Sequence, residues 1–218
     1  MPEIDLLLKY PKPKRPIDER SSTKDENVRN IAKKFEFDYF DGDRSHGYGG
    51  YNYHPRFWSE TVKYIYDHYE LSNQSSILDI GCAKGFMLYD FSLLNKNLKL
   101  RGIDISQYAI NNSKEEIKSI LDIGCASDLP YEDNSFDLII SINTIHNLKI
   151  NDLKKSLKEI IRVTRKNAFI TVDAWRNDEE KANMLKWNLT AETYMHVEDW
   201  KAIFDEVGYS HDYFWFIP

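Results

Sequence analysis

The second half of the chain alternates between short apolar runs and longer stretches with helical periodicity. The apolar runs are typical of buried strands, and the stretches between them place apolar residues three or four positions apart. The predicted strands are 77–80, 98–103, 120–124, 136–142 and 168–172, and the predicted helices are 86–94, 106–119 and a segment around 153–161. This alternation predicts an α/β fold, namely a doubly wound, mostly parallel sheet with helices on both faces.

Further elements are predicted on either side of this core. Residues 56–70 carry apolar side chains on one helical face, so this helix should pack on the sheet just before the first strand. After an irregular stretch at 175–195, a last helix at 197–207 is stopped by Gly208, and a final strand follows at 209–217.

The amino-terminal part of the chain is an extension of helices and loops. Lysines and prolines alternate near residues 9–16, which favours an irregular arm or, alternatively, an arm that contacts a partner or a phosphate. Residues 24–37 are compatible with a helix. Residues 43–54 hold three glycines between tyrosines and histidines, which suits either a lid over a ligand or a surface loop. We divide the chain into an extension, 1–73, and a core, 74–218, of a single domain.

The core is organised around residues 77–85. The strand carries Asp79, and small residues follow in the turn at Gly81, Ala83 and Gly85. A strand that leads through a tight turn into a helix exposes backbone N–H groups where α/β sheets bind ligands. The turn does not match a dinucleotide fingerprint, because Phe86 stands where the third glycine would be. Asp79 would also repel a pyrophosphate but attract a ligand with an ammonium and a sulfonium group, such as S-adenosylmethionine.

Residues 77–85 resemble the first motif of the class I S-adenosylmethionine-dependent methyltransferases, written D-x-G-x-A-x-G in this sequence. The resemblance implies a Rossmann-like fold with S-adenosylmethionine as cofactor, and it covers the whole core. Families of this kind usually carry a glycine where Ala83 stands, so the turn has to accommodate one methyl group.

Other cofactor contacts follow from spacing and from this resemblance. Asp104 ends the second predicted strand nineteen residues past Gly85, where a carboxylate can accept both ribose hydroxyls. The resemblance implies that Asp128 receives the adenine amino group, although it can equally cap its own turn. The predicted cofactor-binding residues are Asp79, Gly81, Ala83, Gly85, Asp104, Ile105, Ser127, Asp128, Leu129 and Asn143.

The string Ile-Leu-Asp-Ile-Gly-Cys-Ala occurs twice, at 77–83 and at 120–126. The second copy is followed by a polar turn, whereas a second nucleotide site would need a helix to present its N–H groups. We therefore interpret the repeat as a coincidence between two buried strands.

Composition narrows the class of partner. A formal net charge of −6 and a pI near 5.6 give no basic field, so we expect no nucleic acid partner and a small-molecule acceptor. No apolar run approaches the ~20 residues of a membrane span, and no signal-peptide pattern is present, so we expect no membrane and a cytoplasmic protein. The two cysteines lack metal-site or disulfide spacing. Monomer and homodimer both remain open.

The acceptor side of the site should follow the fourth and fifth strands. The segment 143–146 lacks the N-P-P-Y type sequence of enzymes that methylate nucleobase amino groups. Catechol-type enzymes of this fold have a metal-binding aspartate at the end of the fourth strand, where Ser141 and Asn143 stand here, so we expect no metal.

Histidine is then the expected general base. His146 follows the fourth strand and is the first candidate. The alternative is that a histidine at this place positions its loop and takes no part in catalysis. His46 and His54 on the glycine-rich segment are the other candidates. The expected substrate-binding residues are Tyr51, Tyr53, Asn188 and His196.

The sequence therefore favours a methyltransferase for a small polar acceptor, acting on oxygen, with a sugar or sugar phosphate as the acceptor. Residues 41–54 also resemble a segment of bacterial small-molecule methyltransferases, some of which accompany surface-polysaccharide biosynthesis. Two alternatives stay open, a nicotinamide-dependent (NAD-type) oxidoreductase and a non-catalytic cofactor-binding module.

Overall fold

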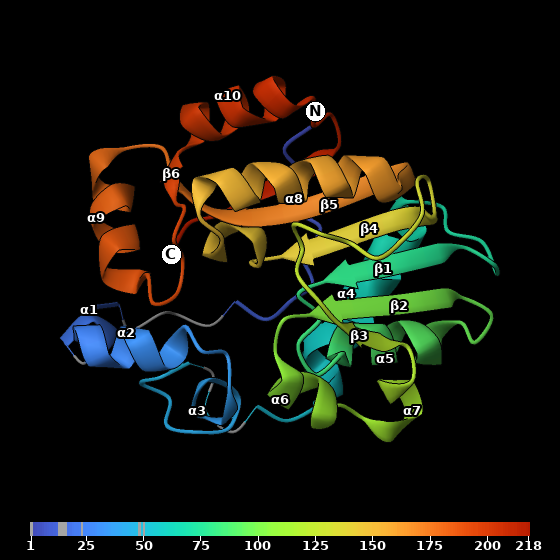
Figure 1. Ribbon diagram of the computed structural model, residues 1–218, viewed down its shortest axis with the longest axis horizontal. Helices are drawn as coiled ribbons and strands as arrows, with labels where there is room; N and C mark the ends of the chain where they lie inside the picture. Colours follow the sequence, from blue (N-terminus) through green and yellow to red (C-terminus); the bar gives the residue numbers. More distant parts are fainter. Residues whose placement is uncertain (1, 13–16, 23, 48, 50) are drawn as a thin grey trace.

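The computed structural model describes residues 2–12, 17–22, 24–47, 49 and 51–218. Within them the sheet has seven strands in the order β3-β2-β1-β4-β5, with β6 and β7 both beyond β5 (Figure 1). The strands are β1 (Ser76–Ile80), β2 (Lys99–Asp104), β3 (Leu121–Ile123), β4 (Phe136–Ile142), β5 (Thr164–Trp175), β6 (Met195–His196) and β7 (Asp212–Phe216). All six pairings are parallel. The predicted doubly wound parallel sheet is confirmed.

Helices cover both faces of this sheet. One face packs against α4 (Pro55–His68), α5 (Phe86–Leu94), α6 (Gln107–Asn111) and α7 (Glu115–Lys118), and the other against α8 (Ile150–Val163) and α10 (Val197–Val207). The alternation of β1 side chains explains the two layers, because Ile77 belongs to the first core cluster and Leu78 to the second. Leu6 of the extension is fully buried in the first cluster.

The far edge of the sheet is formed by the last strand of the chain and by residues of the amino terminus. The last strand, β7, lies directly beside β5 and runs parallel to it. Residues at the amino terminus attach to the outer side of β7: the Ile4 N–H donates to the Tyr213 carbonyl at 2.9 Å, and the Tyr213 N–H donates to the Pro2 carbonyl at 3.4 Å. This pairing covers backbone groups that an open edge strand would expose.

Several predicted elements have different bounds in the structure. The helix predicted at 106–119 is broken into α6 and α7, and the segment predicted as a helix at 24–37 forms α2 (Glu26–Ala32) and α3 (Phe37–Phe40). The stretch expected to be irregular contains α9 (Asp178–Trp187), which buries only Met184 and so has no apolar stripe in the sequence. The remaining helices are α1 (Ile17–Ser22) and the 3-10 turn η1 (Ile145–Asn147).

Two further expectations, on the end of the last helix and on the segment after the third strand, hold. Gly208 ends α10 with a left-handed φ of 76°. Turns follow β3, where a second nucleotide-binding copy would need a helix. The Lys/Pro-rich arm falls partly outside the described residues. None of the described helices is long and apolar enough to cross a membrane.

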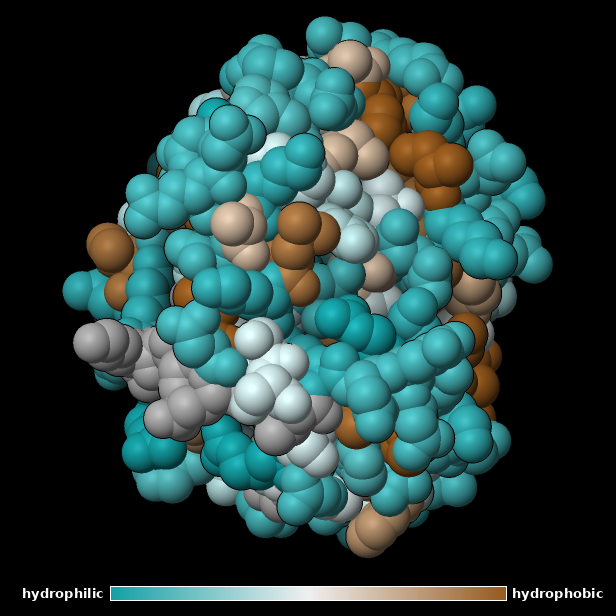
Figure 2. Space-filling model, turned by 90° about the vertical axis from the view of Figure 1, so that its left-hand side faces the viewer, coloured by the Kyte–Doolittle hydropathy of each residue, from teal (hydrophilic) through white to brown (hydrophobic). Residues whose placement is uncertain are grey.

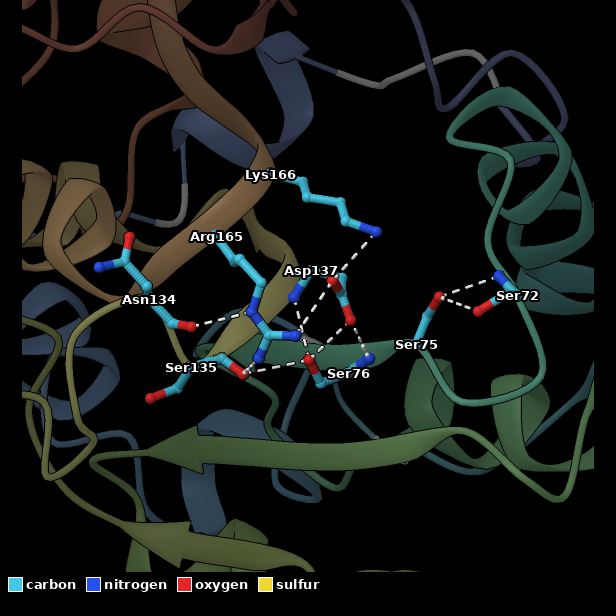
Figure 3. A network of polar contacts seen from close by, with 8 residues as sticks. All are labelled: Ser72, Ser75, Ser76, Asn134, Ser135, Asp137, Arg165 and Lys166. Carbon is cyan, nitrogen blue, oxygen red and sulfur yellow. Dashed lines mark hydrogen bonds and ion pairs between the residues drawn. The ribbon is translucent and has the colours of Figure 1, made fainter.

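A buried carboxylate at the amino ends of the strands fixes how β1, β4 and β5 meet. Asp137 Oδ2 accepts hydrogen bonds from the Ser76 N–H at 2.9 Å and the Ser76 hydroxyl at 3.0 Å (Figure 3). Its Oδ1 lies 3.4 Å from both Arg165 and Lys166. Both cations reach it because β5 has a bulge here: the pairing of β4 with β5 shifts by one residue between Phe136 and Leu138.

Removal of this carboxylate should destabilise the fold. Asp137→Ala leaves the buried Ser76 N–H unpaired, whereas the Ser76 hydroxyl keeps the Ser135 carbonyl and the backbone N–H of residue 137 as partners. We therefore expect a loss of about 1–3 kcal/mol in the free energy of unfolding, measured by urea denaturation. The matched control is Asp133→Ala, because the Asp133 side chain is 69% exposed and its ion pair with Arg162 is worth less than about 1 kcal/mol. Equal losses in the two variants would contradict the assignment.

The same group should contribute to acid sensitivity. Burial alone would raise the pKa of Asp137, but hydrogen bonds from Ser76 and the charge of Arg165 outweigh it and lower the pKa. Its stabilising contribution is therefore present above the pKa of the unfolded chain, about 3.9, and is lost as the pH falls through the lower folded pKa.

Candidate active site

Two cavities lie along the edge of the sheet where the parallel strands end. The larger measures about 560 Å³ and the smaller about 270 Å³. They share the lining residues Tyr39, Gly81, Ala83, Ile142 and Asn143. They therefore adjoin at the turn after β1 and the end of β4. Figure 2 shows the face of the molecule toward which the strand arrows of Figure 1 point, with scattered hydrophobic side chains on a mostly hydrophilic surface.

The turn between β1 and α5 uses left-handed backbone at three of its small residues. Gly81 has φ 78°, Ala83 φ 50° and Gly85 φ 71°. A Cβ on Gly81 would lie 2.0 Å from Thr144 Oγ1, so the backbone approaches the end of β4 as closely as only glycine permits. Ala83 carries its methyl group in the same strained region. Gly85 is the N-cap of α5 and lies against Ile117, outside both cavities.

Two carboxylates face the two cavities. Asp79 lines the larger cavity and is only 5% exposed. Its carboxylate oxygens accept no hydrogen bond from any described residue. Burial, and to a lesser degree the charge of Asp104, raise the pKa of Asp79 to about 8. Asp104 lines the smaller cavity and accepts the Ala83 N–H at 2.7 Å and the Ser106 N–H at 2.8 Å. Burial raises the pKa of Asp104, and these two hydrogen bonds oppose the rise.

The remaining predicted cofactor residues divide into two groups. Asn143 lines both cavities and Ile105 the smaller one. Ser127, Asp128 and Leu129 line neither cavity: Asp128 is exposed, and the Leu129 N–H donates to Glu159 at 2.8 Å. The wall that the smaller cavity has at this point comes from the preceding residues, Gly124, Cys125 and Ala126. These three residues end the repeated string at 120–126. Sequence reasoning treated that string as a coincidence and so did not predict that it lines a cavity.

His146 and Asp173 meet in the larger cavity from the ends of β4 and β5. Both are buried and line the cavity. His146 Nδ1 accepts the Asp173 backbone N–H at 3.0 Å and lies 3.3 Å from Asp173 Oδ1. Burial lowers the pKa of His146, and the negative charge of Asp173 opposes that shift. Because Nδ1 is the acceptor, the proton of the neutral ring is on Nε2, so the ring in this arrangement can donate a hydrogen bond.

Of the four expected substrate-binding residues, two line the larger cavity. Tyr51 and Asn188 do so, but both polar atoms of the Asn188 amide bond Ala191, so this side chain shapes its own loop. Tyr53 lies outside the cavity and donates its hydroxyl to Asp90 at 2.8 Å. His196 caps α10 by accepting the Glu198 N–H at 3.2 Å.

The two other histidine candidates also lie outside the lining of both cavities. His54 is exposed and caps α4 by accepting the Arg56 N–H at 3.2 Å. His46 Nδ1 is buried and has no hydrogen-bond partner among the described residues. The structure thus brings only His146 of the three into the site.

Sequence reasoning missed much of the lining of the larger cavity. Its further lining residues include Tyr10, Lys12, Trp58, Asp173, Arg176, Trp187, Phe214 and Phe216. Arg176 pairs with Glu3 at 2.7 Å, and Lys12 lies 5.7 Å from the centre of the Phe214 ring. In the described part of the chain no group of three or more histidine, cysteine, aspartate or glutamate residues could hold a metal ion.

A parallel sheet with a glycine turn after β1, a carboxylate at the end of β2 and adjoining cavities at the strand ends defines a Rossmann-like cofactor-binding enzyme fold. Residues 71–208 match the family described as "Methyltransferase domain". The chain belongs to this family, whose methyl donor is S-adenosylmethionine. The residues fit that cofactor: Asp79 offers a cationic group a buried carboxyl that has no hydrogen-bond partner among the described residues, and Asp104 faces the adjoining cavity.

Known proteins show the breadth of this family. The chain is 33% identical over 132 residues to tRNA (carboxymethyluridine(34)-5-O)-methyltransferase of Arabidopsis thaliana, covering 60% of this chain and 31% of that protein. It is 32% identical over 103 residues to ajmaline N-methyltransferase of Rauvolfia serpentina, covering 44% and 35%. It thus spans about a third of the length of these relatives.

Solved structures support the fold. A phosphoethanolamine N-methyltransferase of Haemonchus contortus, in complex with phosphomonomethylethanolamine and S-adenosylhomocysteine, is similar with a TM-score of 0.58 at 18% identity, covering 81% of this chain and 44% of that one.

The backbone of the turn predicts opposite effects for two small substitutions. Gly81→Ala forces a Cβ against Thr144, so the free energy of unfolding should fall by at least about 2 kcal/mol. Ala83→Gly relieves left-handed strain of about 1–2 kcal/mol and loses about 0.4–1 kcal/mol through the more flexible unfolded chain. Its melting temperature should therefore stay equal or rise, and a clear fall would contradict the strain at Ala83.

Cofactor binding should release a proton. At pH 7 Asp79 is mostly protonated because of its raised pKa, and a cationic ligand beside it favours the carboxylate. Affinity for S-adenosylmethionine should therefore rise from pH 6 to pH 7.5. Calorimetry at pH 7 in two buffers of different ionisation enthalpy measures the released proton. Asp79→Asn is the matched control and should release none; equal release in both proteins would contradict this role of Asp79.

Proposed function

We propose that this protein transfers the methyl group of S-adenosylmethionine to an oxygen of a small polar acceptor, and that the acceptor is a sugar or a sugar phosphate. The observation that carries the proposal is the His146–Asp173 pair in the larger cavity, beside the turn that carries Asp79. In this proposal, the acceptor hydroxyl lies between the carboxylate of Asp173 and the ring N–H of His146.

The size and charge of the protein support a small acceptor. A cavity of about 560 Å³ is in the range that small ligands occupy, from about 300 to 1,000 Å³. The Arabidopsis relative acts on tRNA, but the formal net charge of this chain is −6, which disfavours a polyanionic substrate.

The lining of the larger cavity supports a sugar. Aromatic side chains supply flat apolar walls from separate parts of the chain, including Trp58, Trp187 and Phe216. Asp173 and Arg176 add polar and charged groups among them. A sugar presents apolar C–H faces to such rings and hydroxyls to such polar groups, and Arg176 can pair with a phosphate.

The chemistry needs positioning and a destination for one proton. The bound cofactor supplies an activated methyl group on a sulfonium. The protein has to align the acceptor oxygen with it and remove the hydroxyl proton. We propose that this proton passes to the His146–Asp173 pair. With Nδ1 held by the Asp173 N–H, His146 donates through Nε2 and orients the acceptor, while the Asp173 carboxylate is the group able to accept. A role of His146 as the base itself requires Nδ1 to release that N–H.

The setting is part of the proposal. The resemblance of residues 41–54 supports a place in bacterial surface-polysaccharide biosynthesis, with the cytoplasm as the compartment. Tyr51 lies in this stretch and lines the larger cavity, which links the resemblance to the acceptor side.

The acceptor class can be tested directly. Purified protein is incubated with S-adenosylmethionine and panels of sugars, sugar phosphates, aromatic alcohols and amines, and S-adenosylhomocysteine formation is followed by mass spectrometry. We expect turnover with the sugar panel and a methyl ether in the product. Turnover confined to amines or to tRNA would overturn the proposal.

Variants of the pair test the proton path. Asp173→Asn keeps the shape but removes the accepting charge, so turnover should fall by roughly 10²–10⁴-fold while S-adenosylhomocysteine affinity stays within about threefold. The turnover of His146→Ala should fall less than that of Asp173→Asn if His146 only orients the acceptor, and by as much if His146 is the base. The wild-type rate should rise with pH through a pKa below that of free histidine, because burial lowers the pKa of His146.

His68→Ala, on the exposed end of α4, is the matched control and should keep full activity. Full activity in both Asp173→Asn and His146→Ala would refute the pair. Loss of activity in His46→Ala or His54→Ala instead would place the base in the extension.

A further inference from the structure

The extension is bonded directly to the cofactor turn through a buried lysine. Lys84 lies between Ala83 and Gly85 and is only 4% exposed. Its ammonium donates to both oxygens of Asp41, at 2.7 and 2.6 Å, and to the Tyr51 carbonyl at 2.8 Å. An ammonium has three hydrogen-bond donors, and these three contacts account for them.

Asp41 is held in its charged form by the same cluster. It also accepts the Tyr108 hydroxyl at 2.6 Å. Burial would raise the pKa of Asp41, but the hydrogen bonds from Lys84 and Tyr108 outweigh burial and lower it. Separation of such a pair leaves each charge unpaired in a poorly hydrated site. The contact between Lys84 and Asp41 is therefore costly to break.

The residues held by Lys84 form part of the walls of the cavities. We call the described residues of 37–53 the strap. Tyr39 lines both cavities, and Gly47 and Tyr51 line the larger one. The Tyr51 ring lies 5.0 Å from that of Phe86, the first residue of α5. The strap thus touches the cofactor turn on both sides of Gly85.

Lys24 and Arg29, earlier in the extension, bond to residues that line the larger cavity. Lys24 donates to the carbonyls of Lys186 and Trp187, and Arg29 donates to the Asn188 carbonyl at 2.8 Å. These carbonyls end α9, where backbone acceptors lack helical partners and cations are favoured. Trp187 and Asn188 line the larger cavity. The described residues of 24–53 therefore contact both the cofactor turn and the far wall of the larger cavity.

We propose that Lys84 is a positioning residue for methyl transfer: it transmits cofactor occupancy of the turn to the strap, and through the strap to the acceptor cavity. The inference rests on the proposed function only in that the cofactor occupies the turn. Lys84 itself directs its ammonium to Asp41 and Tyr51, away from the reacting groups.

Proteolysis of the strap tests this coupling. Arg44 is exposed, so trypsin cleavage after it reports how tightly the strap is held. In the wild type, saturating S-adenosylhomocysteine should slow this cleavage about tenfold or more, because cleavage requires local opening. In Lys84→Met, at a concentration that saturates its own measured affinity, the ligand should still bind but slow cleavage less than about twofold. Cleavage sites are assigned by mass spectrometry.

Three further variants separate coupling from folding. Lys84→Arg keeps a buried cation and should restore part of the protection. Tyr108→Phe removes one hydrogen bond from Asp41 and should give intermediate protection even if Lys84→Met folds poorly. Lys63→Met is the matched control, because Lys63 is exposed and its pair with Asp67 spans 3.3 Å on the surface of α4.

Two results would overturn the inference. One is full ligand-dependent protection in Lys84→Met, and the other is a wild-type strap that saturating ligand does not protect. Calorimetry on the same samples keeps this inference apart from the proposed function: a wild-type protein that binds no S-adenosylhomocysteine would overturn both, whereas binding without protection overturns the coupling alone.

Discussion

The hydrogen bond from the Ala83 N–H to the Asp104 carboxylate is the contact on which the rest of the site depends. It ties the turn after β1 to the end of β2 and holds two buried carboxylates, Asp79 and Asp104, close enough for their charges to interact. The neighbouring cation, Lys84, leaves this negative potential largely in place because the charge of Asp41, with which it pairs, offsets its own. By charge alone, the turn favours a cationic group over a dinucleotide pyrophosphate.

The arrangement of the core could be predicted because the sheet is buried on both faces. Near-continuous apolar runs and the helices between them gave the bounds of α5 and β4 to the residue. The start of β5 could not be found in this way, because Arg165 and Lys166 are charged and exposed. Both residues lie within β5, where their side chains form ion pairs with Asp137 beside the bulge. Helix α9 was missed for the opposite reason: it rests on the protein through caps and cations from the extension and has almost no apolar face.

The candidate site was predictable where the chemistry is local in sequence. Asp79, Asp104 and Asn143 line the cavities because the ends of parallel strands meet at one edge. The aromatic walls were not predictable, because they depend on how the extension packs on the core. Tyr10 packs against Trp58 with ring centres 4.8 Å apart, and no periodicity indicates such a contact. Polar side chains such as His54 and His196 serve as helix caps, which the sequence alone does not distinguish from catalytic roles.

The bulge at Asp137, at the amino ends of β4 and β5, affects which side chains line the larger cavity at the other end of the sheet. Before the bulge Phe136 pairs with Thr164, and after it Leu138 pairs with Asn167, so β5 gains one residue relative to β4. A slip of one residue turns every later side chain of a strand to the other face. With the bulge, Thr171 and Asp173 line the cavity, while Ile170 and Val172 are buried in the core cluster of the opposite face. Without the bulge, Ile170 and Val172 would face the larger cavity. The ion pairs of Arg165 and Lys166 with Asp137 therefore help to place the Asp173 carboxylate beside His146 at the opposite end of the strand.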